Sequence, residues 1–399
     1  MAGLSLFLVA VVGVVVWLTQ RDTTYHAPLD KPTGPQASPA DAARLLHDLE
    51  DAVRRHDAAA GARLGAGPEG SRLAGVVRNG AALHVTGFGL RYVDQVGGVA
   101  PDGSWSADVA TSWRFAGFDR RAEHPEVRVH FAPTGGRLRI ASIGGGGRRS
   151  PLWLAGPVQV RRGTDSLVVV DGTAAEADRV ARYARAAVPQ VRDVLGAWRG
   201  RVVVEVPASE QGLERVLDAK PGQYAAIAAT TTTVDDARSR SAPTHVFVNP
   251  DVFLPLGSAG AQVVITHETT HVATAAATSP APIWLVEGFA DYVALRAQHL
   301  PLTTTASRII ALVRHQGVPR HLPGPGEFAS DAHDLEARYE SAWLACRVLA
   351  DDGGGPALVG FYRAVDAGRP VGASLHRTFG FGVPTLTRQW RTLLSHLPA

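Results

Sequence analysis

The chain has 399 residues, of which 45% are apolar, so it is long enough for two or three domains with substantial cores. Its formal net charge is only +3, and no stripe of basic residues interleaved with aromatic ones appears, which argues against nucleic acid as a partner. Cys346 is the only cysteine, which excludes an intramolecular disulfide and a cysteine-based zinc site.

Residues 1–20 contain an uncharged apolar run, Leu4–Leu18, which is slightly shorter than the ~20 residues of a comfortable membrane span. The run fits a signal peptide or an uncleaved anchor, and we expect the anchor because no positively charged segment precedes it and no clear cleavage motif follows it. Arg21 and Lys31 argue mildly against export, yet long domains are translocated largely regardless of such charges. The sequence therefore predicts a single-pass protein of the cell membrane, with a proline-rich linker over 21–39 and the remainder outside the cytoplasm.

Residues 40–150 are expected to form a small α+β domain. A helix is predicted from Ser38 to about Ala60, because leucines recur there at helical spacing. After a glycine-rich turn, antiparallel strands are predicted over Ala82–Val85, Gly89–Val96, Val109–Phe115, Val127–Phe131 and Arg137–Ile143. This order of elements resembles the cone-shaped nuclear-transport-factor-2-like domains. The scattered histidines of this part lack the spacing of a metal or catalytic cluster: His84, His124 and His130.

Residues 151–399 are expected to form a second domain, joined to the first by the glycine-rich loop 144–150. One or two strands are predicted within Val158–Val170. The next predicted elements are a helix over Ala174–Leu195, a buried strand over Arg201–Val206, a helix over Ser209–Leu217, and two strand-like segments, Ala225–Val234 and His245–Asn249.

The stretch Val263–Ala277 contains the pattern HExxH, formed by His267, Glu268 and His271. On a helix, residues four apart project from one face, so the two imidazoles can bind a single zinc ion. The carboxylate of Glu268 lies beside the first histidine, where it can take a proton from a water on the metal. The alternative is a helix with two buried, hydrogen-bonded histidines, which is less favoured because a second acidic helix follows.

The segment Pro282–Leu295 predicts that second helix, since its apolar residues form a wide face. Glu287 and Asp291 are four residues apart on it and share one face. Glu287 is then a natural third zinc ligand, and Asp291 could accept a hydrogen bond from the far nitrogen of a ligand histidine. Gly288 would let this helix approach another backbone closely.

The sequences HETTH and WLVEGFADY together resemble the gluzincin zinc peptidases, the thermolysin-like clan also called peptidase MA. The resemblance implies that His267, His271 and Glu287 are the zinc ligands and that Glu268 is the general base. It also implies that Asp291 is the acid that hydrogen-bonds a ligand histidine. Only 15 residues separate the second histidine from Glu287, fewer than in the best-known members, which keeps Asp291 open as an alternative ligand. The metzincin variant is excluded, because Thr274 and Ala277 stand where it needs Gly and His.

Gluzincins place a sheet before the HExxH helix, and its edge strand aligns a peptide by main-chain pairing. By this resemblance Ala225–Thr233 is the candidate edge strand, and an ordinary internal strand is an equal alternative. The whole chain is thus expected to be of the α+β class. It would have an N-terminal membrane segment, a small cone-like domain and a zincin-type catalytic domain with a mixed sheet and an all-helical C-terminal part.

The predicted C-terminal helices cover Ala306–His315, Asp334–Ala350, Ala357–Ala367 and Pro384–Leu397, and 317–331 is expected to be a loop near the cleft. Tyr339, in the sequence YESAW, resembles the residue that donates a hydrogen bond to the oxyanion in related zinc peptidases. A core aromatic is an equal alternative, and there are rival donors: His315, His321 and His333.

These features predict a zinc-dependent metallopeptidase acting on a peptide or protein substrate. A second hypothesis is a non-catalytic, zinc-stabilised module of the cell envelope that binds a partner with its N-terminal domain. Glu268 argues against it, because a structural zinc site has a closed fourth position and needs no catalytic carboxylate. A zinc hydrolase of non-peptide amides is the third hypothesis.

Overall fold

The computed structural model describes residues 35–235, 239–329 and 332–398. The expected membrane segment, residues 1–20, and the linker up to residue 34 lie outside the described residues. None of the helices in the described ranges is both long and apolar enough to cross a membrane. The membrane anchor therefore stays a prediction from the sequence.

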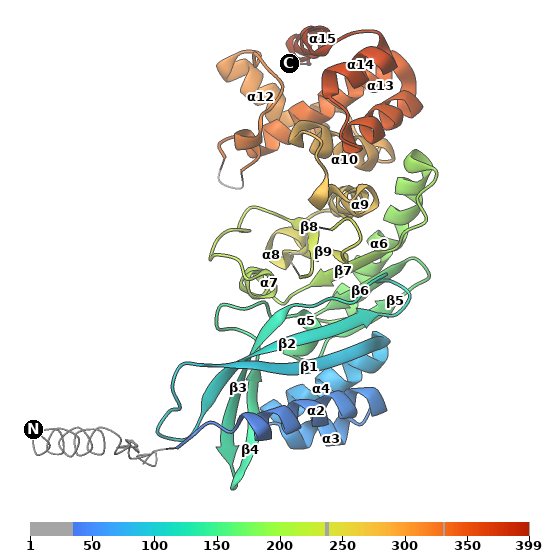
Figure 1. Ribbon diagram of the computed structural model, residues 1–399. Helices are drawn as coiled ribbons and strands as arrows, with labels where there is room; N and C mark the ends of the chain where they lie inside the picture. The colour runs from blue at the N-terminus through green and yellow to red at the C-terminus, as the bar shows by residue number, and fades with distance from the viewer. Residues whose placement is uncertain (1–34, 236–238, 330–331, 399) are drawn as a thin grey trace, which may run out of the picture. The chain divides into compact units, whose positions relative to one another are not determined.

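The first part of the described chain is a four-stranded antiparallel sheet with helices against it (Figure 1). The strands pair in chain order: β1 (Val85–Val96), β2 (Trp105–Phe115), β3 (Glu126–Thr134) and β4 (Arg137–Ile143). Three helices precede the sheet: α2 (Pro39–Arg55), α3 (Ala58–Leu64) and α4 (Glu69–Ala82). Leucines of α2 and aromatic side chains of β2 and β3 belong to one buried apolar core. The likeness to nuclear-transport-factor-2-like domains stays a prediction.

Three predictions in this part are wrong. The segment expected to be a glycine-rich turn contains α4, and the strand expected over Ala82–Val85 is instead the last residue of that helix, a turn and the first residue of β1. His84 then adopts a left-handed conformation with φ of 51°, so β1 begins only at Val85. The first helix also ends earlier than the expected Ala60, at Arg55.

The glycines of α4 explain why its sequence misleads. Gly lowers helix propensity by about 1 kcal/mol relative to Ala, so a segment with several glycines predicts a turn. In the structure these glycines allow close packing between helices, because a Cβ on Gly70 would lie 2.7 Å from the carbonyl oxygen of Ala62. Leu73 and Val77 of α4 are fully buried in the core. Burial of the helix thus outweighs its weak intrinsic propensity.

A second, five-stranded sheet has the strand order β5-β6-β7-β9-β8. The central strands β6, β7 and β9 are parallel, whereas β5 and β8 run antiparallel to their neighbours, so the sheet is mixed, as predicted. The bounds are β5 (Gln159–Arg162), β6 (Ser166–Val170), β7 (Val202–Val206), β8 (Ala229–Thr233) and β9 (Thr244–Val248). The accompanying helices are α5 (Leu152–Ala155), α6 (Ala174–Leu195), α7 (Glu210–Leu217) and α8 (Pro250–Phe253). Of the two readings of the segment that contains β8, the edge strand is therefore the one observed.

The HExxH pattern lies on α9 (Ser258–Thr274), which packs against α6, β8 and the next long helix, α10 (Ile283–Arg296). The sequence of α9 is rich in the β-branched residues Val, Ile and Thr, which disfavour an isolated helix. Thr269, Thr270 and Thr274 donate their hydroxyl hydrogens to the carbonyl oxygens four residues earlier, at 2.7–2.9 Å. These threonine hydroxyls therefore have hydrogen-bond partners where α9 packs against its neighbours. The helix is stabilised by this tertiary packing and not by its intrinsic propensity.

From Ile283 onward the described residues form helices and loops only, as the sequence predicts. Gly354, with φ of 82° and ψ of 163°, interrupts α13 where the sequence predicts a helix end. The elements after α10 are α11 (Leu302–Thr305), α12 (Ser307–Gln316), the 3-10 turn η2 (Pro325–Phe328), α13 (Leu335–Asp366), α14 (Val371–Phe379) and α15 (Val383–Ser395).

Gly288 is the point where α10 approaches α13 most tightly. A Cβ there would collide with the carbonyl oxygen of Ala342 and lie 3.1 Å from Cys346 Sγ. We expect Gly288→Ala to lower the free energy of unfolding by about 1–3 kcal/mol, the usual cost of overpacking a core. Gly360→Ala on the same helix pair is the matched control, since nothing lies within 4 Å of its Cβ, and it should leave the stability equal or slightly higher. Equal denaturation midpoints for the two variants would contradict the close approach.

Candidate active site

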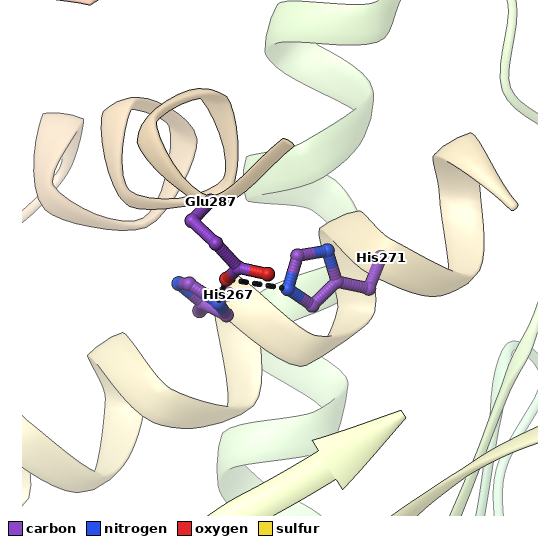
Figure 2. A group of neighbouring side chains, drawn as sticks. All are labelled: His267, His271 and Glu287. Carbon is purple, nitrogen blue, oxygen red and sulfur yellow. Dashed lines mark hydrogen bonds and ion pairs between the residues drawn. The ribbon is translucent and has the colours of Figure 1, made fainter. Parts of the chain in front are cut away.

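Side chains from α9 and α10 converge at one point (Figure 2). His267 and His271 lie one turn apart on α9, and Glu287 faces them from α10. The Oε2 atom of Glu287 is 3.1 Å from Nε2 of His267 and 3.2 Å from Nε2 of His271. The three side chains are only 12, 10 and 12% exposed, in the order His267, His271 and Glu287. The three predicted ligands are thus together, with one donor atom of each directed at the others.

Asp291 lies behind His267 rather than between the histidines. Its Oδ1 atom is 2.7 Å from Nδ1 of His267, so the ring donates its Nδ1–H to the carboxylate and turns the lone pair of Nε2 toward Glu287. This is the outer position that the sequence predicts for Asp291. The alternative in which Asp291 replaces Glu287 as a ligand does not fit this arrangement.

The donor atoms fit a zinc ion. Two imidazole nitrogens and one carboxylate oxygen are a common ligand set of zinc in hydrolases. With Nδ1 of His267 protonated, the lone pair of Nε2 faces the Glu287 carboxylate, and a cation between them would turn that repulsion into attraction. In the absence of a cation, the rings would have to be protonated, and His271 and His267 then lower the pKa of Glu287 overall although its burial acts to raise it.

Glu268 is held by a residue that the sequence reasoning missed. Thr231, on the edge strand β8, donates its hydroxyl hydrogen to Glu268 Oε2 at 2.6 Å and lies 3.2 Å from the Glu268 carbonyl oxygen. Glu268 is only 7% exposed, so this contact is shielded from water. The run of threonines at 230–233 indicates a strand but says nothing about which residue faces α9.

Removing the Thr231 hydroxyl should therefore loosen the general-base candidate. A hydrogen bond to a charged group contributes about 1.5–3 kcal/mol, so we expect Thr231→Val to lower the turnover number roughly tenfold or more, with KM and zinc content little changed. Thr231→Ser keeps the hydroxyl and should restore most of the rate. Steady-state kinetics with metal analysis would measure this, and equal rates for the Val and Ser variants would exclude a positioning role for Thr231.

Two adjoining cavities, of about 530 and 380 Å³, open beside the cluster. Five residues contribute to the walls of both cavities: Ile227, Ala229, His267, Glu268 and Tyr339. The larger cavity continues along apolar side chains, which are Leu256, Val263 and Val264. Its wall also contains Glu340, whose pKa burial raises to about 7, so the charge of this wall changes near neutral pH. The histidines and Glu268 therefore lie where the two cavities meet.

Tyr339, on α13, faces the cluster across the cleft. Its ring centroid is 6.2 Å from that of His267 and 5.4 Å from that of Phe328. Burial raises the pKa of Tyr339, and the carboxylates of Glu287 and Glu268 raise it further, so the hydroxyl keeps its proton and can donate it in a hydrogen bond. The rival donors are exposed and line neither cavity in the described part of the chain: His315, His321 and His333.

The chain has a weak likeness to a solved structure. No protein-family model matches the sequence, and no match was found among curated proteins. Among solved structures, the chain is similar to a mutant of an M1 zinc metallopeptidase from Deinococcus radiodurans, with a TM-score of 0.35 and 15% sequence identity. The likeness covers 79% of this chain and 63% of that one.

Proposed function

We propose that the chain is a zinc-dependent metallopeptidase that hydrolyses peptide bonds in peptide or protein substrates. The observation that carries the proposal is the convergence of His267, His271 and Glu287 beside the buried carboxylate of Glu268, at the junction of two cavities. A purely structural zinc site would have a fourth protein ligand and no need of a cleft. The cleft and Glu268 therefore favour an enzyme over the non-catalytic zinc module.

The metal ligands and their neighbour define where the chemistry would occur. When held by His267, His271 and Glu287, zinc would act as a Lewis acid that makes water more acidic and polarises a carbonyl group. Asp291 keeps the His267 ring in the tautomer that presents Nε2 to the metal. Because Asp291 accepts a hydrogen bond from Nδ1–H, the ring nitrogen that does not face Glu287, its role is to orient a ligand.

Three further groups would handle protons and charge during hydrolysis. Glu268 accepts a proton from the attacking water and passes it to the leaving amine. Thr231 holds the Glu268 carboxylate in place through its 2.6 Å hydrogen bond. Tyr339 donates its hydroxyl hydrogen to the carbonyl oxygen as that oxygen becomes negative.

The edge strand β8 suits an extended peptide. It pairs with β9 on one side. On its other side no strand of the described residues pairs with it, so β8 forms an edge of the five-stranded sheet. An extended substrate adding to this edge would gain main-chain hydrogen bonds and place side chains in cavities on either side of His267. This geometry supports a peptide over a small non-peptide amide.

The decisive experiment for the proposed function is an assay of the full chain against a peptide library, with and without a metal chelator. We expect cleavage that the chelator abolishes and added zinc restores. Cleavage that survives complete zinc removal, or none at all with zinc bound, would contradict the proposal. Hydrolysis of small acyl amides in place of peptides would favour the non-peptide hydrolase.

We further propose that residues 1–20 anchor the protein in the cell membrane with the catalytic part outside the cytoplasm. The support is the apolar run Leu4–Leu18 at the N-terminus of the sequence. Protease added to intact cells should degrade the C-terminal part. Complete protection in intact cells, with digestion only after lysis, would reverse the orientation.

A further inference from the structure

A second cluster of ionisable side chains lies where the connection between β2 and β3 meets the five-stranded sheet. His245 of β9 is at its centre, with Nε2 3.0 Å from Asp119 Oδ1 and 3.5 Å from Glu123 Oε1. The other ring nitrogen, Nδ1, is 2.7 Å from Oε1 of Glu205 on β7. The four side chains are almost fully buried, since none is more than 6% exposed.

The charges of this cluster do not balance. His245 can carry one positive charge against the three carboxylates. Among the described residues, His245 is the ion-pair partner of all three acids. Carboxylates shielded from water are costly unless they are paired or bind a metal. The cluster therefore needs either a proton on one carboxyl group or positive charge beyond that of a single imidazolium ion.

Glu123 is the residue whose bonding is incomplete. Its side chain is 1% exposed, and neither of its carboxylate oxygens has a hydrogen-bond partner among the described residues. Burial raises the pKa of Glu123, Asp119 and Glu205 raise it further, and His245 opposes them. A cavity of about 10 Å³ lies beside Glu123, Glu205 and Arg149, which is space for about one water molecule.

The remaining contacts orient the donor atoms as in a metal site. Asp119 accepts the backbone N–H of Phe115 at 2.7 Å through its other oxygen, and the Phe115 ring stacks on His245 with centroids 5.6 Å apart. Glu205 accepts the Nδ1–H of His245, which turns the lone pair of Nε2 toward the two remaining carboxylates. Asp291 has the same relation to His267 in the HExxH cluster.

The spacing of the donor atoms also fits a metal. Ligands at about 2.0–2.2 Å from a tetrahedral zinc ion lie roughly 3.3–3.6 Å from one another. The contacts of His245 Nε2, at 3.0 and 3.5 Å, are close to those of the HExxH cluster, at 3.1 and 3.2 Å. We propose that Asp119, Glu123 and His245 bind a second divalent metal ion of the zinc class, with Glu205 holding the histidine ring.

This ion would have a structural role. It would tie the β2–β3 connection to β9, and His245 pairs in the sheet with Thr232 of the edge strand. Thr232 is the neighbour of Thr231, which holds Glu268. Binding at the second cluster should therefore stabilise the sheet that supports the active site, without contributing a group to the reaction.

The test counts zinc bound to the full chain after saturation and removal of free metal. We expect about two equivalents for the unsubstituted chain and about one for the His271→Ala/Glu287→Ala variant, which lacks the first site. Adding Glu123→Gln to that variant should abolish the remaining equivalent. Adding Glu126→Gln instead is the matched control, because this half-exposed acid of the same region pairs with Arg148 and should leave zinc bound.

A second measurement keeps the test independent of whether the Glu123→Gln protein folds. In the His271→Ala/Glu287→Ala variant, the unfolding temperature should fall by several degrees when a chelator is added and recover with zinc. One equivalent in the unsubstituted chain and none in this variant would overturn the proposal. Zinc that persists through both Glu123→Gln and Asp119→Asn would also overturn it, because the ion would then lie elsewhere.

Discussion

Replacing Glu268 by glutamine is expected to lower peptide turnover by at least ~10²-fold while zinc stays bound, the usual scale for losing a general base. Glutamine has nearly the same size and can still accept the hydrogen bond of Thr231 through its amide oxygen. It cannot accept a proton from water. Because Glu268 is not among the three side chains that converge on each other, the metal site should remain intact.

The measurement is the initial rate on a cleaved peptide, together with the zinc content of the same preparation. Glu336→Gln is the matched control, since Glu336 also lines the larger cavity but is 70% exposed and pairs with Arg308. It should lower the rate little. An undiminished rate in Glu268→Gln with zinc in place would rule out the general-base mechanism.

Single alanine substitutions of His267, His271 and Glu287 are each expected to remove about one equivalent of zinc from the chain and to abolish the peptidase activity. Each substitution deletes one of three donor atoms, and two protein ligands hold zinc poorly. Metal analysis after dialysis against a mild chelator would show the loss. Full zinc content in Glu287→Ala would contradict its assignment and return Asp291 to consideration as the ligand.

Asp291→Asn distinguishes a ligand from a group that orients one. It removes the charge that holds the His267 ring but leaves all three donor atoms, so zinc affinity should fall only roughly 10–100-fold. At saturating zinc the turnover should largely recover, because the reacting groups are unchanged. Loss of activity that zinc cannot restore would mean that Asp291 has a direct part in the reaction.

Local spacing explains why much of the candidate site could be predicted. His267 and His271 are four residues apart, and so are Glu287 and Asp291, which puts each pair on one face of any helix that contains it. That regularity does not depend on the rest of the fold. Periodicity and turn residues also predicted the helical C-terminal part, whereas the mixed sheet was expected from the resemblance to zincin-type domains.

Local patterns failed where packing overrides propensity. The glycines before β1 predicted a turn, yet α4 forms because those glycines permit close contact between helices. The threonine run indicated a strand, but only the tertiary structure shows Thr231 directed at Glu268 from the edge of the sheet.

The HExxH helix and its acidic partner helix were thus determined locally, because a helix fixes the relative directions of residues four apart. Which acid faces both histidines, and which lies behind one, depends on how α10 packs on α9, and the structure puts Glu287 in front and Asp291 behind. The cluster of Asp119, Glu123, Glu205 and His245 left no trace in the sequence. Its members come from the β2–β3 connection and from strands β7 and β9 and are up to 126 positions apart, so only the folded chain brings their charges within a few ångströms.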